Sequence, residues 1–393
     1  MKNKPTFLLH IVIGLQCFCS LAQDSLLTQM AQNHHTLLSV EKDSFTGSGW
    51  ETIINAAQKS DFVLIGEDHF TNEVPFFCNA LTSKIKFDNF ICEIDPYSAN
   101  IIQSKIKTLT EEQLQNYIHD FGNTFSFYAL ASEFDLLSKI VKSGTNVFGT
   151  DQILMIADRL ICSELKLITE NKAAKIIYQR IEDQSKDYFS AFLNDPSKPM
   201  YMLTEEYAKN LEEVSNLKVS TYEKEVIEKL KLTTKIYKEQ NHHLRIQLMK
   251  NQLMEQYEVW KDKKNLFKFG ANHVSKGESF LKIYDLGNLV DNIADSQYTS
   301  SLHLLIVGKS GSQGSPFKDF PESPIDSNSS NLKALKPFFD IVVNEKAWYC
   351  LEMLPIREKL ENGEITTNDV QLSRIIKGFD YVLLIPKVTA GKF

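Results

Sequence analysis

The sequence predicts an α/β fold: a mostly parallel central sheet flanked by helices, with a large helical insertion acting as a lid. Short apolar runs rich in strand formers alternate with segments of helical periodicity, which is the pattern of a parallel sheet. The clearest run, Phe62–Ile65, is apolar throughout, as in a strand that is buried on both faces. Strand character vanishes from about residue 153 to 262 and then returns. We therefore expect 23–152 and 263–393 to form two halves of one α/β core, separated by an insertion at 153–262.

The N-terminus has the pattern of a signal peptide. Lys2 and Lys4 precede the apolar run 7–15, and small residues at 20 and 22 offer a cleavage site after residue 22. No later run approaches the roughly 20 apolar residues that a membrane span needs. We expect 1–22 to be removed, and the protein to be exported to the periplasm or secreted, without a membrane span.

Charge and cysteine usage exclude two classes of function. Residues 1–22 carry two lysines and no acid, so the mature chain has 41 basic and 50 acidic side chains, formally −9. An acidic chain offers no basic surface to a nucleic acid. The four remaining cysteines form no CxxC pair, which excludes a zinc ribbon or a redox motif, although export permits a disulfide. They are Cys78, Cys92, Cys162 and Cys350.

The first half of the core is expected to open with a polar approach at 23–48, followed by a helix over 50–60. After the strand Phe62–Ile65, Thr71 or Asn72 can cap a helix. Strands at Asn89–Ile94 and Asn146–Gly149 follow, separated by a helical passage of roughly fifty residues.

The insertion and the second half are read in the same way. Charged stretches with apolar residues at three-to-four spacing fill 153–262, and the longest candidate helix lies near 222–262. Strands are then expected at Leu266–Gly270, Leu302–Val307, Phe339–Val343 and Tyr381–Ile385, and an extended loop at 308–331.

Three successive strands end in a carboxylate: Glu67, Glu93 and Asp151. The carboxyl ends of parallel strands lie at one edge of a sheet, where α/β proteins place their chemistry. His69 and His273 each follow an apolar strand that ends in glycine, one on each side of the insertion. We expect these imidazoles to meet across a shared cleft that contains Glu67 and Glu93.

Two kinds of chemistry remain open for such a site. A carboxylate beside an imidazole raises its pKa and fixes its tautomer, as a general base needs. The same groups could instead bind a divalent metal, with His69, Glu93 and His273 as ligands. Motifs of the common serine hydrolases, HExxH zinc proteases, phosphate-binding loops and dinucleotide folds are missing from the sequence.

The strings "LIGEDH", "CEIDPYSA", "FGTD", "RIQLMKNQL" and "GANHVSKG" resemble the erythromycin-esterase-like proteins. They also resemble that superfamily's relatives, the ChaN haem-binding lipoproteins and the Tiki/TraB proteases. The correspondence covers most of the mature chain in order, but only a few short motifs carry it.

The resemblance implies roles for individual residues. His69 would activate water, with Glu67 and Glu93 holding it and His273 assisting. Arg245 matches the helix that precedes the second histidine, and it would bind an anionic group of the substrate. An exposed arginine on an amphipathic helix is the competing interpretation.

Asp151, at the end of its strand, is assigned with Arg245 to substrate binding. The chain departs from the macrolide esterases in two places. One residue separates Glu67 from His69 where the esterases have two, and "GANH" stands where they have "AHN". Both departures argue against macrolide hydrolysis itself.

The predicted function is an exported hydrolase that cleaves an ester or amide bond of a small-molecule or peptide substrate by His/Glu-assisted attack of water. The alternatives are a haem-binding protein of the ChaN type and a metal-dependent protease of the Tiki/TraB type. No cofactor is assigned, and the oligomeric state is left open. The helical insertion is expected to set substrate size and to exclude water.

Overall fold

The computed structural model describes residues 25–330 and 332–393. Within these residues the main sheet has nine strands and is mostly parallel, which confirms the predicted α/β class. The chain divides into two compact units. Unit 1 contains residues up to Ile85, Phe269–Gly314 and Glu322–Ala390, and unit 2 contains Lys86–Lys268, Ser315–Pro321 and Gly391–Phe393.

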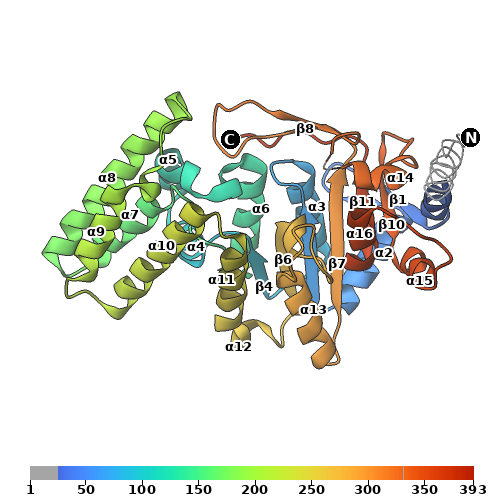
Figure 1. The fold of residues 1–393 in the computed structure, drawn as a ribbon, viewed down its shortest axis with the longest axis horizontal. Coiled ribbons are helices and arrows are strands. Elements are labelled where there is room, and N and C mark those ends of the chain that lie inside the picture. Colours follow the sequence, from blue (N-terminus) through green and yellow to red (C-terminus); the bar gives the residue numbers. More distant parts are fainter. Residues whose placement is uncertain (1–24, 331) are drawn as a thin grey trace, which may run out of the picture. The chain divides into compact units, whose positions relative to one another are not determined.

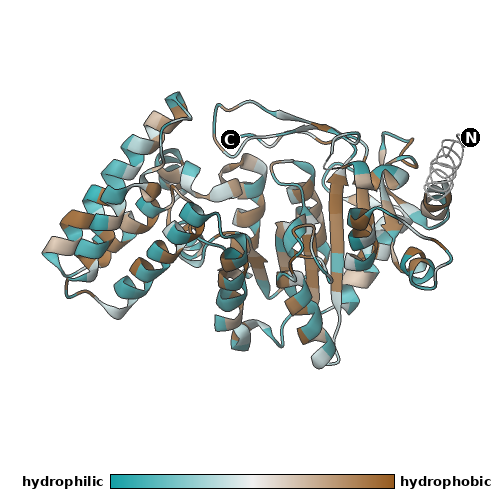
Figure 2. Cartoon of the chain, viewed as in Figure 1, coloured by the Kyte–Doolittle hydropathy of each residue, from teal (hydrophilic) through white to brown (hydrophobic). Residues whose placement is uncertain are grey.

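Six strands of the sheet belong to unit 1, in the order β2-β1-β10-β11-β7-β3. The parallel strands β3, β7 and β11 are buried apolar runs, and Figure 2 shows β3 and β7 coloured largely hydrophobic. The other three strands, β1, β2 and β10, pair antiparallel at one side. The bounds are β1 His35–Val40, β2 Phe45–Thr46, β3 Phe62–Glu67, β7 Ser301–Gly308, β10 Ala347–Glu352 and β11 Tyr381–Ile385.

Amphipathic helices cover the sheet of unit 1. The helices α2 Ser48–Lys59, α3 Glu73–Lys84, α13 Leu286–Ser296, α14 Lys336–Phe339, α15 Leu354–Glu361 and α16 Val370–Gly378 belong to this unit. Phe45 lies among aromatic rings of α2, α3 and β10, with ring centroids 5.2 Å from Trp50 and 4.7 Å from Trp348. The Phe45–Trp348 pair is edge-to-face and the Phe45–Trp50 pair is tilted, and aromatic contacts of this kind add to the energy gained by burying the rings.

The loop that follows β3 is closed by two segments from the far end of the sequence. Phe70 has a φ of 69°, and its carbonyl accepts a hydrogen bond from Gly314 N at 2.8 Å. Asn72 N donates to Thr389 O at 3.0 Å. Gly314 follows the hairpin strand β8 Ser310–Gln313, which pairs with β9 Ser323–Asp326. A rare backbone conformation is thus held in place from outside the loop.

Unit 2 contains the parallel strands β6-β4-β5, although the last two residues of β6 belong to unit 1. Their bounds are β4 Asn89–Cys92, β5 Asn146–Gly149 and β6 Asn265–Gly270. Asn89 lies between Asn146 and Asn265 in register, donates to Asn265 Oδ1 at 2.7 Å, and accepts from Asn146 Nδ2 at 3.3 Å. These amides satisfy one another at the amino ends of the strands.

The rest of unit 2 is helical. Its helices are α4 Pro96–Thr108, α5 Glu111–Phe121, α6 Ala131–Lys142, α7 Asp158–Ile168, α8 Lys172–Asn194, α9 Glu205–Ser215, α10 Thr221–Glu239, α11 His242–Glu255 and α12 Tyr257–Trp260. Figure 1 shows α7 to α10 side by side as a bundle. Its core contains Ile161, Ile177, Tyr178 and Leu230, which recur at helical spacing and face inward.

Some predicted elements are wrong. Phe339–Val343 is not a strand: Phe339 is the last residue of α14, a short helix with Pro337 in its first turn, and the buried Ile341 and Val342 lie in the turn that follows. The helix expected over 222–262 is three helices, interrupted at Gln240 (φ 49°) and again at Gln256. The loop expected at 308–331 contains the β8–β9 hairpin. The strands β1 and β10 were not expected.

Several predictions fall outside what the structure decides. The predicted signal peptide, 1–22, lies outside the described residues. The lid boundaries at 153 and 262 stay a prediction, since the compact units divide at Ile85 and Lys268. Within the described residues, no helix has the length and apolarity that crossing a bilayer requires. Cys78, Cys92, Cys162 and Cys350 are buried thiols that form no disulfide among the described residues.

Candidate functional site

The end of β3 carries the first imidazole–carboxylate pair in unit 1. Glu67 is the last residue of β3, and its Oε1 atom lies 2.8 Å from His69 Nδ1. The Glu67 side chain is 1% exposed and the His69 side chain 23%. A carboxylate accepts the Nδ1 hydrogen, so the lone pair of a neutral His69 ring is on Nε2.

A second pair follows β6. His273 lies in the short 3₁₀ turn Ala271–His273, and its Nδ1 atom is 3.0 Å from Asp285 Oδ2. Both side chains are buried, at 5% and 0% exposure. The other oxygen of Asp285 accepts from Leu286 N at 2.6 Å and caps helix α13. The cap therefore fixes the carboxylate that orients His273.

Asp285 was missed by the sequence analysis. The available signal was an aspartate directly before the amphipathic segment 286–296, which is the usual position of an N-cap. Nothing in the sequence connects that cap to a histidine twelve residues earlier.

The segments that carry His69 and His273 pack against each other within unit 1. A Cβ atom added to Gly66 would lie 3.1 Å from Ala271 Cα and 2.6 Å from Val274 Cγ2. The strand β3 and the 271–273 turn are therefore in close contact at Gly66, and only glycine permits this approach. The structure thus brings together the two chain segments that the sequence predicts to share a site.

A third carboxyl group lies between Glu67 and His69. Burial raises the pKa of Asp68, the nearby His69 opposes this rise in pKa, and the charge of Glu67 adds to it. Asp68 therefore holds a proton more tightly than an exposed aspartate does.

The other three predicted residues form an ion cluster in unit 2. Arg245, on α11, donates from Nε to Asp151 Oδ1 at 2.8 Å and from Nη2 to Asp151 Oδ2 at 2.7 Å. Its Nη2 atom also lies 2.8 Å from Glu93 Oε1. Burial alone would lower the pKa of Arg245, but Asp151 and Glu93 outweigh it and raise that pKa well above its usual value. We call Glu93, Asp151 and Arg245 the arginine clamp.

The backbone around the arginine clamp is tightly constrained. A Cβ atom on Gly149, at the end of β5, would lie 2.4 Å from Ile94 O, so β4 and β5 meet closely where their acids begin. With its amide turned to match its surroundings, Gln252 donates to Thr150 O at 2.7 Å and to Asp151 O at 3.1 Å. Gln252 lies two turns after Arg245 on α11 and was missed by the sequence analysis.

A buried aspartate lies just beyond Glu93. Asp95 caps α4 by accepting from Ser98 N at 2.8 Å. Burial raises the pKa of Asp95 to about 6, against the hydrogen bond from Ser98 N, which favours the charged form.

The structure places the predicted residues in two groups. Glu67, His69 and His273 lie in unit 1, and Glu93, Asp151 and Arg245 lie in unit 2. Among the described residues, no group of three or more His, Cys, Asp or Glu side chains is arranged to hold a metal ion. The catalytic and substrate-binding roles of all six residues stay predictions.

Comparisons with known proteins extend this description. No protein-family model matches the chain, and neither does any curated protein. A Bacillus cereus protein solved in a structural genomics programme is 15% identical, with a TM-score of 0.57 over 94% of this chain and 98% of that one. A succinoglycan biosynthesis protein is 13% identical, with a TM-score of 0.55 over 94% and 99% of the two chains.

A mutant of the erythromycin esterase EreC in its open conformation is 12% identical, with a TM-score of 0.58 over 91% of this chain and 98% of that one. ChaN of Campylobacter jejuni is matched with a TM-score of only 0.30, which carries no argument. The resemblance expected from the sequence motifs is therefore confirmed for the fold of the erythromycin esterase.

Proposed function

We propose that the protein is a hydrolase of ester or amide bonds that uses His69 as a general base toward water. The observation that carries this proposal is the pair of imidazoles, each with its Nδ1 atom on a buried carboxylate. This arrangement leaves the lone pair on Nε2, the nitrogen that can take a proton from water.

The proposed reaction needs no covalent intermediate. The oxygen of water attacks the carbonyl carbon, and its proton moves to Nε2 of His69. Collapse of the tetrahedral intermediate breaks the C–O or C–N bond, and the leaving group receives the proton. Glu67 stabilises the imidazolium that forms on His69. The His273 ring, which is held by Asp285, is the second polar group that assists the reaction.

In unit 2, we propose that Asp151 and Arg245 bind the substrate. Arg245 is bonded to both carboxylates of the arginine clamp, and a guanidinium does not lose its proton. The cation of the clamp therefore keeps its charge, whereas an imidazole can change its own.

The test is an assay of the purified protein against a panel of chromogenic esters, lactones and peptide amides. His69→Ala should lower kcat/KM on any active substrate by roughly 10²–10⁴-fold, the usual contribution of a general base. His119→Ala, at an exposed position on α5, is the matched control and should leave the rate unchanged.

Full activity of His69→Ala on an identified substrate would contradict the proposal. Single-turnover hydrolysis in ¹⁸O-labelled water adds a second criterion, because direct attack places one ¹⁸O atom in the acid product in the first turnover. An initial burst, in which the leaving group is released faster than in the steady state, would show a covalent intermediate instead.

One observation also favours a metal-dependent variant of this chemistry. An imidazole that binds a metal usually donates its other N–H to a carboxylate, as His69 and His273 do. A divalent metal would be held by their Nε2 atoms and would supply an activated water. Elemental analysis of the purified protein, with activity measured before and after chelation, separates this variant from the metal-free one.

Titration with hemin tests the haem-binding alternative through a Soret band.

We also propose that the protein is exported, from the lysines and apolar run of residues 1–15 and the small residues before 23. The intact mass of protein recovered from outside the cytoplasm should lack residues 1–22. Recovery of the full-length mass from the cytoplasm alone would contradict export.

A further inference from the structure

Val274, the residue after His273, is in close contact with three elements of unit 1. Gly66 on β3 meets the Val274 side chain, and a Cβ atom on Gly287 of α13 would lie 2.5 Å from Val274 O. From β7, His303 Nδ1 lies 2.5 Å from the same carbonyl oxygen. Three elements of unit 1 therefore determine where the peptide group that follows His273 can lie.

The His303 ring is a fully buried hydrogen-bond donor. A carbonyl oxygen can only accept, so His303 must carry its hydrogen on Nδ1. Its Nε2 atom faces the Ser301 hydroxyl at 3.0 Å. Burial first, and then the positive charge of Lys276, lower the pKa of His303 to about 4. The ring therefore stays neutral at pH 7, in a single tautomer.

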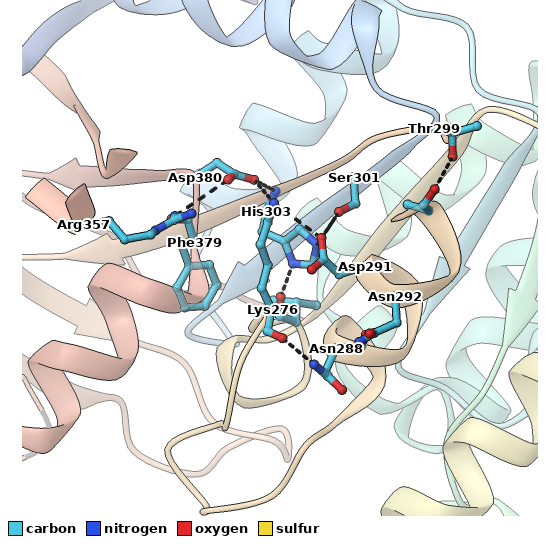
Figure 3. Close-up of polar contacts among 12 residues, drawn as sticks. Lys276, Asn288, Asp291, Asn292, Thr299, Ser301, His303, Arg357, Phe379 and Asp380 are labelled. Atoms are coloured by element: carbon cyan, nitrogen blue, oxygen red, sulfur yellow. Dashed lines mark hydrogen bonds and ion pairs between the residues drawn. The ribbon is translucent and has the colours of Figure 1, made fainter. Parts of the chain in front are cut away.

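A charged network fixes the surroundings of this ring (Figure 3). Asp380 Oδ2 accepts from the backbone N of His303 at 2.9 Å and lies 3.1 Å from Lys276 Nζ. Ser301 Oγ lies 2.6 Å from Asp291 Oδ1, and that carboxylate oxygen lies 3.5 Å from Lys276 Nζ. Arg357 completes the network, with Nη2 3.8 Å from Asp380 Oδ1.

The network also reaches back to the segment that carries His273. Lys276 lies three residues after His273, its N–H donates to Gly378 O at 2.9 Å, and its carbonyl accepts from Asn288 Nδ2 at 2.6 Å. The 273–276 segment is thus bonded through Val274 and again through Lys276. These groups hold the backbone on which the pair formed by His273 and Asp285 depends.

We propose that His303 is a positioning residue for His273: its Nδ1–H group holds the Val274 carbonyl and thereby aligns the His273 ring with Asp285. The inference deepens the proposed function, because the aligned ring belongs to the proposed site. The alignment itself is a structural property that can be measured without turnover.

Two nearly isosteric variants separate the two nitrogens of His303. The side-chain amide nitrogen of asparagine lies near the Nδ1 position of a histidine, and that of glutamine lies near the Nε2 position. His303→Asn should therefore keep the bond to Val274, and His303→Gln should lose it. Ser301→Ala removes the contact on the Nε2 side, and with it the contact of Ser301 with Asp291, but leaves the Nδ1 bond to Val274 in place. It is the matched control.

The readout is the downfield proton resonance of His273 Nδ1–H in its hydrogen bond to Asp285, assigned by its loss in His273→Gln. We expect the resonance in the wild type, in His303→Asn and in Ser301→Ala. In His303→Gln it should be lost or broadened by exchange with water. The same resonance at the same shift in His303→Gln would overturn the proposal.

A measurement on the wild type covers the case in which His303→Gln does not fold. Ring-¹⁵N-labelled histidine reports the tautomer of each imidazole through its two nitrogen shifts, and an Nε2–H tautomer for His303 would overturn the proposal. On an identified substrate, His303→Gln should lower kcat about tenfold and His303→Asn should restore it. If the wild type has no activity but the resonances behave as stated, the proposed function fails and the positioning role stands.

Discussion

Carboxylates at the ends of strands are used differently in the two units. In unit 1, Glu67 accepts a hydrogen bond from an imidazole, whose unperturbed pKa is near 6.5. In unit 2, Glu93 and Asp151 are bound to a guanidinium that does not titrate in proteins. The hydrogen-bond distances are similar, 2.8 Å between Glu67 and His69 and 2.7–2.8 Å in the arginine clamp, but the two sets of ion pairs differ in chemistry.

The difference lies in what the cation can do. An imidazole can accept and release a proton near neutral pH, so the pair in unit 1 is suited to chemistry. The arginine of the clamp keeps its charge and joins the ends of β4 and β5 to α11, so its removal should appear first in stability. The predictions below test this division.

The largest expected effect comes from Arg245→Ala. It leaves two mostly buried carboxylates without their cation, which should cost about 3–5 kcal/mol of unfolding free energy. Urea unfolding of the wild type and the variant measures this cost. By comparison, His69→Ala removes one hydrogen bond and should cost about 1–2 kcal/mol.

Arg245→Lys provides the matched control for the arginine clamp. It keeps the charge and loses the two parallel bonds to Asp151, so its cost should fall between those of the wild type and the alanine variant. A loss below about 1 kcal/mol in Arg245→Ala would show that the clamp is not structural and would remove the contrast between the units.

A smaller effect is expected for a buried carboxylate whose hydrogen bonds come from a hydroxyl and a backbone N–H group. Asp158, at the start of α7, accepts from the Ser185 hydroxyl at 2.6 Å and from Arg159 N at 2.8 Å. Burial raises the pKa of Asp158 to about 7. The folded protein therefore binds a proton that the unfolded chain releases above about pH 4.

The sign of the pH effect follows from this difference. The contribution of Asp158 to stability is full below about pH 4 and is lost as the pH rises to about 7, by at most about 1.4 kcal/mol per pH unit. The free energy of unfolding of the wild type should therefore fall relative to that of Asp158→Asn across this window. Parallel curves for the two proteins would contradict the assignment.

The smallest effect is expected at a surface pair in unit 2. Lys139 Nζ lies 2.6 Å from Asp135 Oδ2 on α6, and the two side chains are 62% and 52% exposed. Such pairs contribute about 0.3–0.5 kcal/mol, so Lys139→Ala should shift the urea midpoint only slightly. A loss comparable to that of Arg245→Ala would mean that distance, rather than burial, governs these pairs.

Local features were the ones that the sequence could predict. The strands at 146–149 and 381–385 have the predicted bounds, because each is an apolar run that ends abruptly. The pair of Glu67 and His69 also depends only on neighbours in sequence. By contrast, β1 is mostly exposed and lacks the apolar run of a strand, and it pairs with β10 more than three hundred residues later.

Pairings between distant segments explain most of what was missed at the site. The charge pattern of α11 left an exposed arginine open as an interpretation, but two acids from other elements cover Arg245 and leave it 19% exposed. Asp285 and His303 have ordinary roles when read alone, as a helix cap and as a residue in an apolar strand. Their contacts with the 273–274 segment exist only once the sheet has formed.

The closure of the loop after β3 bears on when a working protein can exist during its synthesis. Asn72 is 317 positions from Thr389, to which both its backbone and its side chain are bonded. A ribosome adds Thr389 only 317 residues after Asn72, so the loop that carries His69 is synthesised long before the residue that closes it. A nascent chain therefore carries His69 in a loop that is not yet closed. In a chain truncated before residue 389, this loop should stay open.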